Sequence, residues 1–216
     1  MVIAIDGPSG AGKGTLARTV AERLGYTHVD TGAMYRAVAW KAQQDGLPLD
    51  DDMKVTELAE NSDIEQRDGR ITIDGVDVTR DIRTPAIDKA ATSVARLPGV
   101  REALVRKFRQ LGERGAVVME GRDIGTVVFP DADLKFYIDA SPEERARRRA
   151  ADPAHTGGQG SLELVQSDIA ARDKSDSTRS VAPLARANDA IFIDTTSMPV
   201  DAVVNKVMSM IRERLE

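Results

Sequence analysis

Short apolar runs recur along the chain, and longer stretches with helical spacing separate them. The apolar runs predict buried strands at residues 2–5, 27–29, 116–119, 134–138 and 190–193. They are largely continuous, as is typical of parallel strands covered on both faces, and Lys135 is the one charge in them, expected to be exposed. Helical spacing predicts helices at residues 16–24, 33–44, 100–112, 143–151, 162–172 and 200–215. This alternation predicts an α/β fold with a five-stranded parallel sheet, helices on both faces, and ligands at the carboxyl ends of the strands.

Two segments interrupt this alternation. Residues 64–79 alternate apolar and polar positions, and Asp68-Gly69 and Asp74-Gly75 within them are hairpin signals. We therefore expect a small antiparallel β insert at about residues 63–95, on the substrate side of the domain. Residues 152–160 are rich in proline and glycine, which predicts a mobile lid loop at about residues 150–162.

The first predicted strand leads into a glycine-rich turn. The turn consists of Gly7, Pro8, Ser9, Gly10, Ala11, Gly12, Lys13, Gly14 and Thr15. Its spacing fits the Walker A phosphate loop, in which backbone N–H groups and the next helix start bind phosphates and the lysine reaches the outer ones. Gly14 occupies the position at which the Walker A loop carries a Mg²⁺-binding hydroxyl. The hydroxyl of Thr15 comes one residue later, where it can reach an inner phosphate. We expect this loop to bind a purine nucleoside triphosphate, whose Mg²⁺ would be held by phosphate oxygens, waters and more distant carboxylates. The alternative is a turn that only joins a strand to a helix.

Composition excludes several other kinds of site. The 216 residues include no cysteine, which excludes disulfides, thiolate zinc sites and cysteine nucleophiles. The two histidines, His28 and His155, are too few for a histidine metal cluster, and we expect both at the surface. The net charge of −5 argues against a generally basic nucleic-acid-binding surface. Since no targeting segment or long apolar span is recognisable, we expect a cytoplasmic protein that does not bind membranes, and the lack of a heptad seam favours a monomer.

Arginines gather near the predicted strand ends and indicate a second phosphate site. Arg36 follows the second strand, Arg122 follows the third, residues 172–179 follow a long helix, and residues 145–149 flank the lid. Planar guanidinium groups suit bidentate phosphate recognition and the charge of a transferring phosphoryl group. The alternative for each cluster is a solvated helix face or a surface ion pair. Glu120 ends the third strand, where it could hold the water shell of Mg²⁺ or act as a structural cap.

Four segments occur together in one order. They are the phosphate loop at 7–15, Asp-Thr-Gly-Ala-Met-Tyr-Arg at 30–36, Glu-Gly-Arg-Asp-Ile-Gly-Thr-Val-Val-Phe-Pro at 120–130, and Arg-Asp-x-x-Asp-x-x-Arg-x-x-Ala-Pro-Leu at 172–184. With them the chain resembles the bacterial cytidylate kinase family, a group of nucleoside monophosphate kinases, over essentially its whole length. The resemblance implies a single P-loop kinase domain over residues 1–216 that transfers a phosphoryl group from ATP to CMP and dCMP with Mg²⁺. It also implies that the β insert binds the nucleoside monophosphate.

The resemblance implies a role for each candidate site residue. The residues implied at the acceptor are Arg36 and Arg122 at its phosphate, Arg172 and Asp176 at its ribose, Thr92, Arg101, Asp123 and Arg179 at its cytosine, and Thr31 as a further substrate contact. Lys13 would stabilise charge on the transferred group, and we expect the lid to bring Arg145, Arg148 or Arg149 over the phosphates. The family often has aspartate at the position of Glu120 and serine at those of Thr31 and Thr92.

Cytosine recognition also follows from the chemistry of the base. A carboxylate such as Asp123 accepts from the 4-amino group while an arginine donates to N3 and O2, whereas uracil would leave donors facing donors. Asp123 could instead pair with Arg122.

Rival acceptors are UMP, AMP or a small metabolite such as shikimate. A protein of a different class, a GTPase-like switch, is a further alternative. The chain lacks the guanine-reading Asn-Lys-x-Asp motif, which argues against this alternative.

Overall fold

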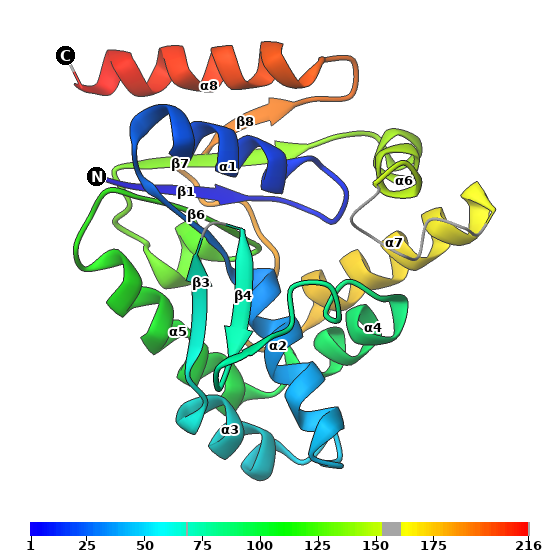
Figure 1. Cartoon of the computed structure of the whole chain (residues 1–216). Helices are drawn as coiled ribbons and strands as arrows, with labels where there is room; N and C mark the ends of the chain where they lie inside the picture. The colour runs from blue at the N-terminus through cyan, green and yellow to red at the C-terminus, as the bar shows by residue number, and fades with distance from the viewer. Residues whose placement is uncertain (68, 153–160, 216) are drawn as a thin grey trace.

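The computed structural model describes residues 1–67, 69–152 and 161–215, and a parallel sheet forms its centre (Figure 1). The strands are β1 (Val2–Asp6), β2 (Thr27–Asp30), β6 (Val117–Gly121), β7 (Leu134–Asp139) and β8 (Ile191–Asp194). They lie in the order β2-β6-β1-β7-β8, and every pairing is parallel. The predicted five-stranded parallel sheet is therefore confirmed.

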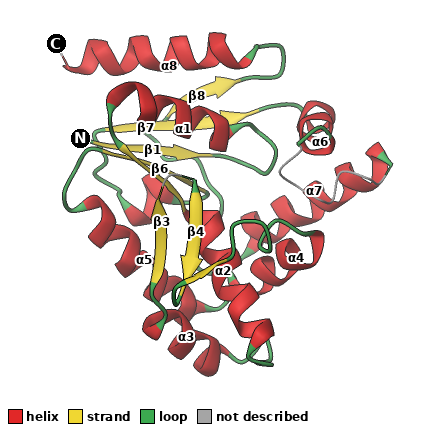
Figure 2. Ribbon diagram, in the orientation of Figure 1, coloured by secondary structure: helices red, strands yellow, loops and turns green. Residues whose placement is uncertain are grey.

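Helices cover both faces of the sheet (Figure 2). They are α1 (Lys13–Leu24), α2 (Thr31–Gln44), α3 (Asp52–Asn61), α4 (Pro85–Val94), α5 (Pro98–Gly112), α6 (Pro142–Ala150), α7 (Leu162–Thr178) and α8 (Val200–Leu215), with a π-helical turn η1 (Ile124–Val128) after β6. In β1, Ile3 and Ile5 belong to the apolar cluster formed with α1 and α8, whereas Ala4 belongs to the cluster formed with α2, α3 and α5. Both faces of the strand are thus covered, which explains its continuous apolar sequence.

The β insert is a three-stranded antiparallel sheet formed by β3 (Ile64–Arg67), β4 (Arg70–Ile73) and β5 (Val76–Asp77). Asp74 and Gly75 have φ values of 51° and 77°, the left-handed conformation that an Asp-Gly hairpin turn requires. The buried side chains of β4 pack with α2 in a separate apolar cluster. A small antiparallel sheet is thus confirmed within the predicted insert, although helix α4 (Pro85–Val94) forms the later part of the predicted range 63–95. The binding role of the insert stays a prediction.

Two predictions from the apolar pattern were wrong. α7 continues to Thr178, so that Arg172 lies within a helix instead of following one. Lys135 is buried instead of exposed, because its Nζ donates to Asp189 Oδ2 at 2.7 Å and to the Pro130 carbonyl oxygen. A buried ammonium group needs such partners to offset the loss of water.

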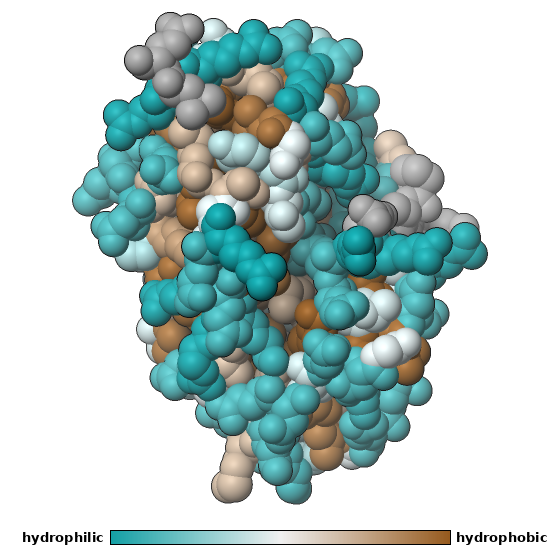
Figure 3. Space-filling view, turned by 60° about the vertical axis from the view of Figure 1, so that its left-hand side comes forward, coloured by the Kyte–Doolittle hydropathy of each residue, from teal (hydrophilic) through white to brown (hydrophobic). Residues whose placement is uncertain are grey.

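Hydrophilic residues cover most of the face seen in Figure 3, and apolar residues show there only in separate areas. None of the helices within the described ranges combines the length and the apolar character needed to cross a membrane. The predicted lid falls largely on residues 153–160, which lie outside the described residues.

Candidate functional site

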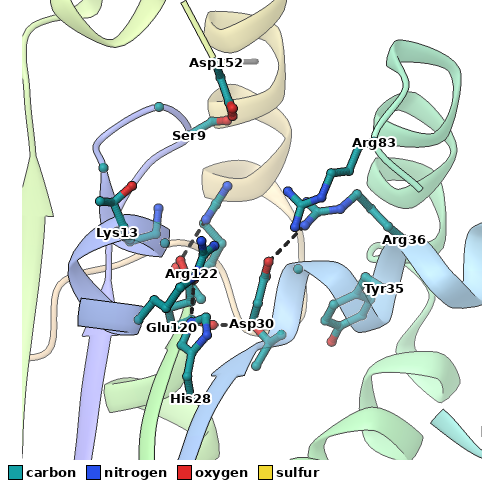
Figure 4. Close-up of a pocket in the computed structure, with 18 of the residues that line it drawn as sticks. Ser9, Lys13, His28, Asp30, Tyr35, Arg36, Arg83, Glu120, Arg122 and Asp152 are labelled. Carbon is teal, nitrogen blue, oxygen red and sulfur yellow. Dashed lines mark hydrogen bonds and ion pairs between the residues drawn. The ribbon is translucent and has the colours of Figure 1, made fainter. Parts of the chain in front are cut away.

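The glycine-rich loop connects the carboxyl end of β1 to α1, and its shape depends on missing side chains (Figure 4). Gly7 has a φ of 146°, and a Cβ atom there would lie 2.0 Å from the Ile138 carbonyl oxygen. At Gly10, with a φ of 76°, a Cβ atom would lie 2.8 Å from the Arg145 carbonyl oxygen. Gly12 is the N-cap of α1 and has no side chain to occupy the first N–H groups of the helix. Those groups can therefore bind an anion.

Lys13 begins α1 and is buried inside the loop. Its Nζ donates to the Pro8 carbonyl oxygen at 2.6 Å. Burial, together with the nearby positive charge of Arg122, lowers the pKa of Lys13 to about 7. A neighbouring phosphate would have the opposite effect, because an anion favours the ammonium form. The charge of this lysine thus depends on what the loop binds.

A cavity of about 1560 Å³ extends from the loop along the carboxyl ends of β2 and β6. It is lined by Ser9, Gly10, Gly12, Lys13, Gly14, Thr15, Thr31, Arg36, Thr92, Arg101, Glu120, Arg122, Asp123, Arg149, Arg172, Asp176 and Arg179. The loop residues Gly7, Pro8 and Ala11 do not contribute to this lining, and Ala11 packs instead in the apolar cluster beside α8. Since single-ligand pockets span about 300–1,000 Å³, this cavity has room for two substrates.

Arg36 and Arg122 enter the cavity from α2 and from the end of β6. Arg36 Nη2 lies 3.2 Å from Asp30 Oδ2, and Arg122 Nε lies 3.0 Å from Asp176 Oδ2. Figure 4 shows Arg122 beside Lys13 and Arg36 reaching toward Asp30. Although burial opposes the charge of Arg122, the carboxylate of Asp176 and other nearby acids raise its pKa above the usual value. Both guanidinium groups are therefore held in place as cations within the cavity.

Arg149, at the end of α6, and Arg172, in α7, share one carboxylate. Arg172 Nη1 lies 3.3 Å from Asp88 Oδ1, and Arg149 Nη2 pairs with Asp88 Oδ2. Burial lowers the pKa of both arginines below the usual value, and the positive charge of Arg36 acts in the same direction. Asp88 carries no recognisable signal in the sequence, because an acidic residue in the first turn of a helix is common and its partners belong to distant segments.

Asp123 joins two buried arginines. Arg101 Nη2 lies 2.5 Å from Asp123 Oδ2, and Arg179 Nη2 lies 3.4 Å from Asp123 Oδ1. The side chains of Arg101 and Arg179 are only 3% and 4% exposed. The alternative pairing of Asp123 with Arg122 is not the one observed, since Arg122 pairs with Asp176. The arrangement presents a carboxylate and two guanidinium groups on one wall of the cavity.

Tyr35 is a cavity residue that the sequence analysis missed, although it directly precedes Arg36. Its ring centre lies 5.4 Å from the guanidinium carbon of Arg101, and burial raises its pKa to about 12. Within the described ranges, Tyr35 Oη, Arg36 Nε and Arg101 Nε are buried without a hydrogen-bond partner. Unpaired buried donors are costly, which indicates that a ligand completes this part of the cavity.

Glu120, at the end of β6, lies beside the loop position that lacks a hydroxyl. A Cβ atom on Gly14 would lie 3.2 Å from Glu120 Oε1, so that the missing side chain leaves room for this carboxylate. Glu120 Oε1 also lies 3.1 Å from Nε2 of His28, which is half-buried, and the prediction that His28 lies at the surface was wrong. Among the residues that the structure describes, no group of three or more His, Cys, Asp or Glu side chains could hold a metal ion. A single carboxylate suits an ion held mainly by phosphates and water.

Two threonines of the site have partners within the protein. Thr31 Oγ1 donates to the Glu120 carbonyl oxygen at 2.7 Å, and Thr92 Oγ1 donates to the Asp88 carbonyl oxygen at 2.9 Å. Each hydroxyl oxygen still has lone pairs that can accept a hydrogen bond. Both side chains can therefore contact a ligand while they keep these bonds.

The arginines of α6 bind different partners. Arg145 pairs with Asp173 and donates to the Ser9 carbonyl oxygen at 3.1 Å. Arg148 donates to the Ala11 carbonyl oxygen at 3.2 Å. These bonds fasten α6 to the backbone of the phosphate loop. A single helix thus does not direct all its arginines at one point, since neighbours in sequence face different ways.

Comparison with known proteins decides the family. The family model described as cytidylate kinase matches residues 3–213. The chain belongs to the cytidylate kinase family. A cytidylate kinase of Solibacter usitatus (strain Ellin6076) is 46% identical over 222 residues, which cover 100% of this chain and 94% of the relative. Another, from Clostridioides difficile (strain 630), is 44% identical over 211 residues, or 98% of each chain.

This member of the cytidylate kinase family shares its fold with more distant kinases. A shikimate kinase from Bacteroides thetaiotaomicron is similar in structure, with a TM-score of 0.53, 11% identity and coverage of 98% of both chains. At this identity the likeness concerns the fold alone. Together with the observed sheet, it confirms the predicted P-loop kinase fold.

Proposed function

We propose that this protein transfers the γ-phosphoryl group of ATP to the phosphate of CMP or dCMP, producing ADP and CDP or dCDP. The observation that carries the proposal is a cavity, in a member of the cytidylate kinase family, that joins a phosphate loop to a second group of arginines and acids. Two anionic substrates can meet there, each on its own set of positive groups.

At the donor end, the backbone of the loop binds the ATP phosphates. Gly7 and Gly10 allow that backbone to lie close against β7 and α6 in the shape of a phosphate loop, and the start of α1 adds its own N–H groups. Lys13 exchanges its bond to the Pro8 carbonyl for the transferred phosphoryl group and becomes fully protonated there. Thr15 binds an inner phosphate.

At the acceptor end, Arg36 and Arg122 bind the phosphate of the nucleoside monophosphate. Arg172 and Asp176 contact the ribose. Because Arg36 and Arg122 are already held by carboxylates, their orientation is set before the substrate binds, which reduces the entropic cost of reaching the reactive geometry.

The cytosine base binds at the wall formed by Asp123, Arg101 and Arg179. Asp123 accepts from the 4-amino group, and an arginine donates to N3 and O2. A uracil base would turn its N3–H toward the arginines and its O4 toward the carboxylate. Such buried mismatches are costly, so the site favours CMP over UMP. Thr92 supplies a further polar contact to the base.

Catalysis is positioning and charge neutralisation. An oxygen of the CMP phosphate attacks the γ-phosphorus in line, and the bond to the bridging oxygen of ADP breaks. The acceptor is already anionic, so that neither a protein nucleophile nor a strong base is needed. Lys13, Arg122 and Arg149 neutralise charge on the group in transfer. Glu120 would hold the water shell of Mg²⁺, which would supply further neutralisation of charge on the phosphate oxygens.

A panel of acceptors tests the proposed reaction. ADP release from ATP is measured with CMP, dCMP, UMP, AMP and shikimate at equal concentrations. We expect turnover with CMP and dCMP, a kcat/KM about 100-fold lower with UMP, and none above background with AMP or shikimate. Comparable rates with UMP would contradict the cytosine assignment. ADP release that needs no acceptor would instead indicate a nucleotide-hydrolysing switch.

Two finer parts of the proposal have their own tests. Glu120→Gln should raise the Mg²⁺ concentration needed for half-maximal turnover by about 10-fold, because the variant holds the water shell less tightly. We also propose that the protein is a monomer, for which light scattering should give the mass of one chain, 23.4 kDa.

A further inference from the structure

Asp88 connects the helix that follows the β insert to two arginines of the cavity. It lies in the first turn of α4, which begins at Pro85 after the N-cap residue Thr84. Its two carboxylate oxygens take different partners, Arg172 of α7 at 3.3 Å and Arg149 of α6. The Asp88 side chain is 15% exposed, so this contact is largely shielded from water. One carboxylate thereby joins three helices at the cavity.

The charges around Arg149 and Arg172 explain why a carboxylate is needed there. Burial disfavours both cations, and Arg36 repels both, with Arg122 adding to the repulsion at Arg172. Asp88 attracts both of them, and Asp152 adds to the attraction at Arg149 as Asp176 does at Arg172. Without the Asp88 carboxylate, the two guanidinium groups would separate or turn toward water. Arg149 and Arg172 line the cavity whereas Asp88 is outside its lining, so Asp88 holds them without occupying substrate space.

The same helix carries a residue expected to contact the acceptor base. Thr92 follows Asp88 by one helical turn, and its hydroxyl donates to the Asp88 carbonyl oxygen at 2.9 Å. α4 packs against α2, which carries Arg36, and it also contacts α7. The position of α4 therefore governs both the base contact and the two arginines.

We propose that Asp88 is a positioning residue for phosphoryl transfer, which holds Arg149 at the transferring phosphate and Arg172 at the ribose of the acceptor. The proposal rests on the proposed function, in which Arg149 acts on the phosphates and Arg172 on the ribose. Asp88 itself touches neither substrate. Its loss should therefore affect the catalytic step more than the binding of ATP.

The test compares Asp88→Asn with the wild-type protein in the CMP assay. We expect kcat to fall about 10- to 100-fold, because small displacements of charge-neutralising groups have effects of this size, while KM for ATP stays within about twofold. Asp88→Glu, which keeps the charge, should restore part of the loss. Asp81→Asn is the matched control, since it removes an exposed carboxylate from the segment just before α4 and should leave kcat unchanged.

A double-mutant cycle shows whether Asp88 acts through Arg149. In an Arg149→Gln background, Asp88→Asn should lower kcat by less than about threefold, because Arg149, through which Asp88 acts on the transferring phosphate, is gone. Equal losses in both backgrounds would overturn the proposal. Thermal unfolding identifies variants that fail to fold, and Asp88→Ser repeats the comparison if Asp88→Asn is one of them.

Two outcomes separate this inference from the proposed function. If the wild-type protein does not turn over CMP, the proposed function fails, whatever Asp88 does. If the wild-type protein is active and Asp88→Asn keeps its kcat, the carboxylate does not contribute to catalysis. If the wild-type protein is active and Asp88→Asn binds CMP more tightly, the carboxylate competes with the substrate phosphate. Either result would overturn the positioning role alone.

Discussion

The two ends of the cavity are built in opposite ways. The donor end is one contiguous loop, residues 7–15, whose shape is set by its backbone and by the absence of side chains at its glycines. The acceptor end is assembled from charged side chains on α2, α5, β6 and α7, and its arginines are held by carboxylates from other elements. The donor end should therefore be sensitive to added atoms, and the acceptor end to lost charges.

The largest effect should come from the acceptor end. Arg122→Gln removes a cation from the transferring phosphate and leaves Asp176 paired only at its other oxygen, with Arg179, and we expect kcat with CMP to fall about 1,000-fold. ATP affinity, measured by calorimetry, should change little because the loop is intact. Arg212→Gln, at an exposed position of α8, is the control and should match the wild-type protein. Surviving CMP turnover would show that the acceptor phosphate binds elsewhere.

The next effect should come from the donor end. Gly7→Ala places a Cβ atom 2.0 Å from the Ile138 carbonyl oxygen, so the loop must move, and we expect ATP affinity to fall about 100-fold. Gly46→Ala also changes a glycine with a positive φ, 67°, but no atom lies within 4 Å of the new Cβ, and it should cost about 1 kcal/mol of stability without affecting ATP binding. Equal ATP affinity in the two variants would contradict the importance of this close approach.

A smaller effect should separate base recognition from phosphate binding. Asp123→Asn replaces an acceptor by an amide that can also donate, and we expect the preference for CMP over UMP, measured as the ratio of kcat/KM values, to fall about 10-fold. Asp131→Asn, at an exposed position, should keep the wild-type ratio. An unchanged ratio in Asp123→Asn would show that the wall formed with Arg101 and Arg179 does not read the base.

The smallest effect concerns the single charge of the donor loop. Because burial lowers the pKa of Lys13 to about 7, this lysine is largely neutral at about pH 8 before ATP binds and charged afterwards. ATP binding should then take up part of a proton at about pH 8, and much less of it at about pH 6, where the lysine is charged in both states. Calorimetry in buffers with different ionisation enthalpies measures this uptake. Lys13→Met should abolish it, and an uptake independent of pH would contradict the low pKa.

The elements that could be predicted are those whose cause is local. The continuous apolar run of β1 reflects burial on both faces, and the glycines at 7–15 reflect the close approach of the loop backbone to β7 and α6. Failures arose where charges, and not apolar spacing, decide the structure. The last turns of α7 contain Arg172, Asp173 and Asp176, which form ion pairs with residues of other segments. Because charged residues hold these turns in place, their sequence shows no apolar periodicity. Lys135 was misplaced for the same reason, since Asp189 is far along the chain.

By itself, the sequence determined the α/β architecture and the phosphate loop, because residue type and short-range spacing specify these, and its resemblance to a known family supplied the proposed acceptor residues. Only the tertiary structure decided how the acceptor charges are paired. It joined Asp123 to Arg101 and Arg179, placed Tyr35 beside them, and gave Asp88 two arginines from other helices. Ion pairs between distant segments form wherever folding brings opposite charges together, and no periodicity along the chain records the partner.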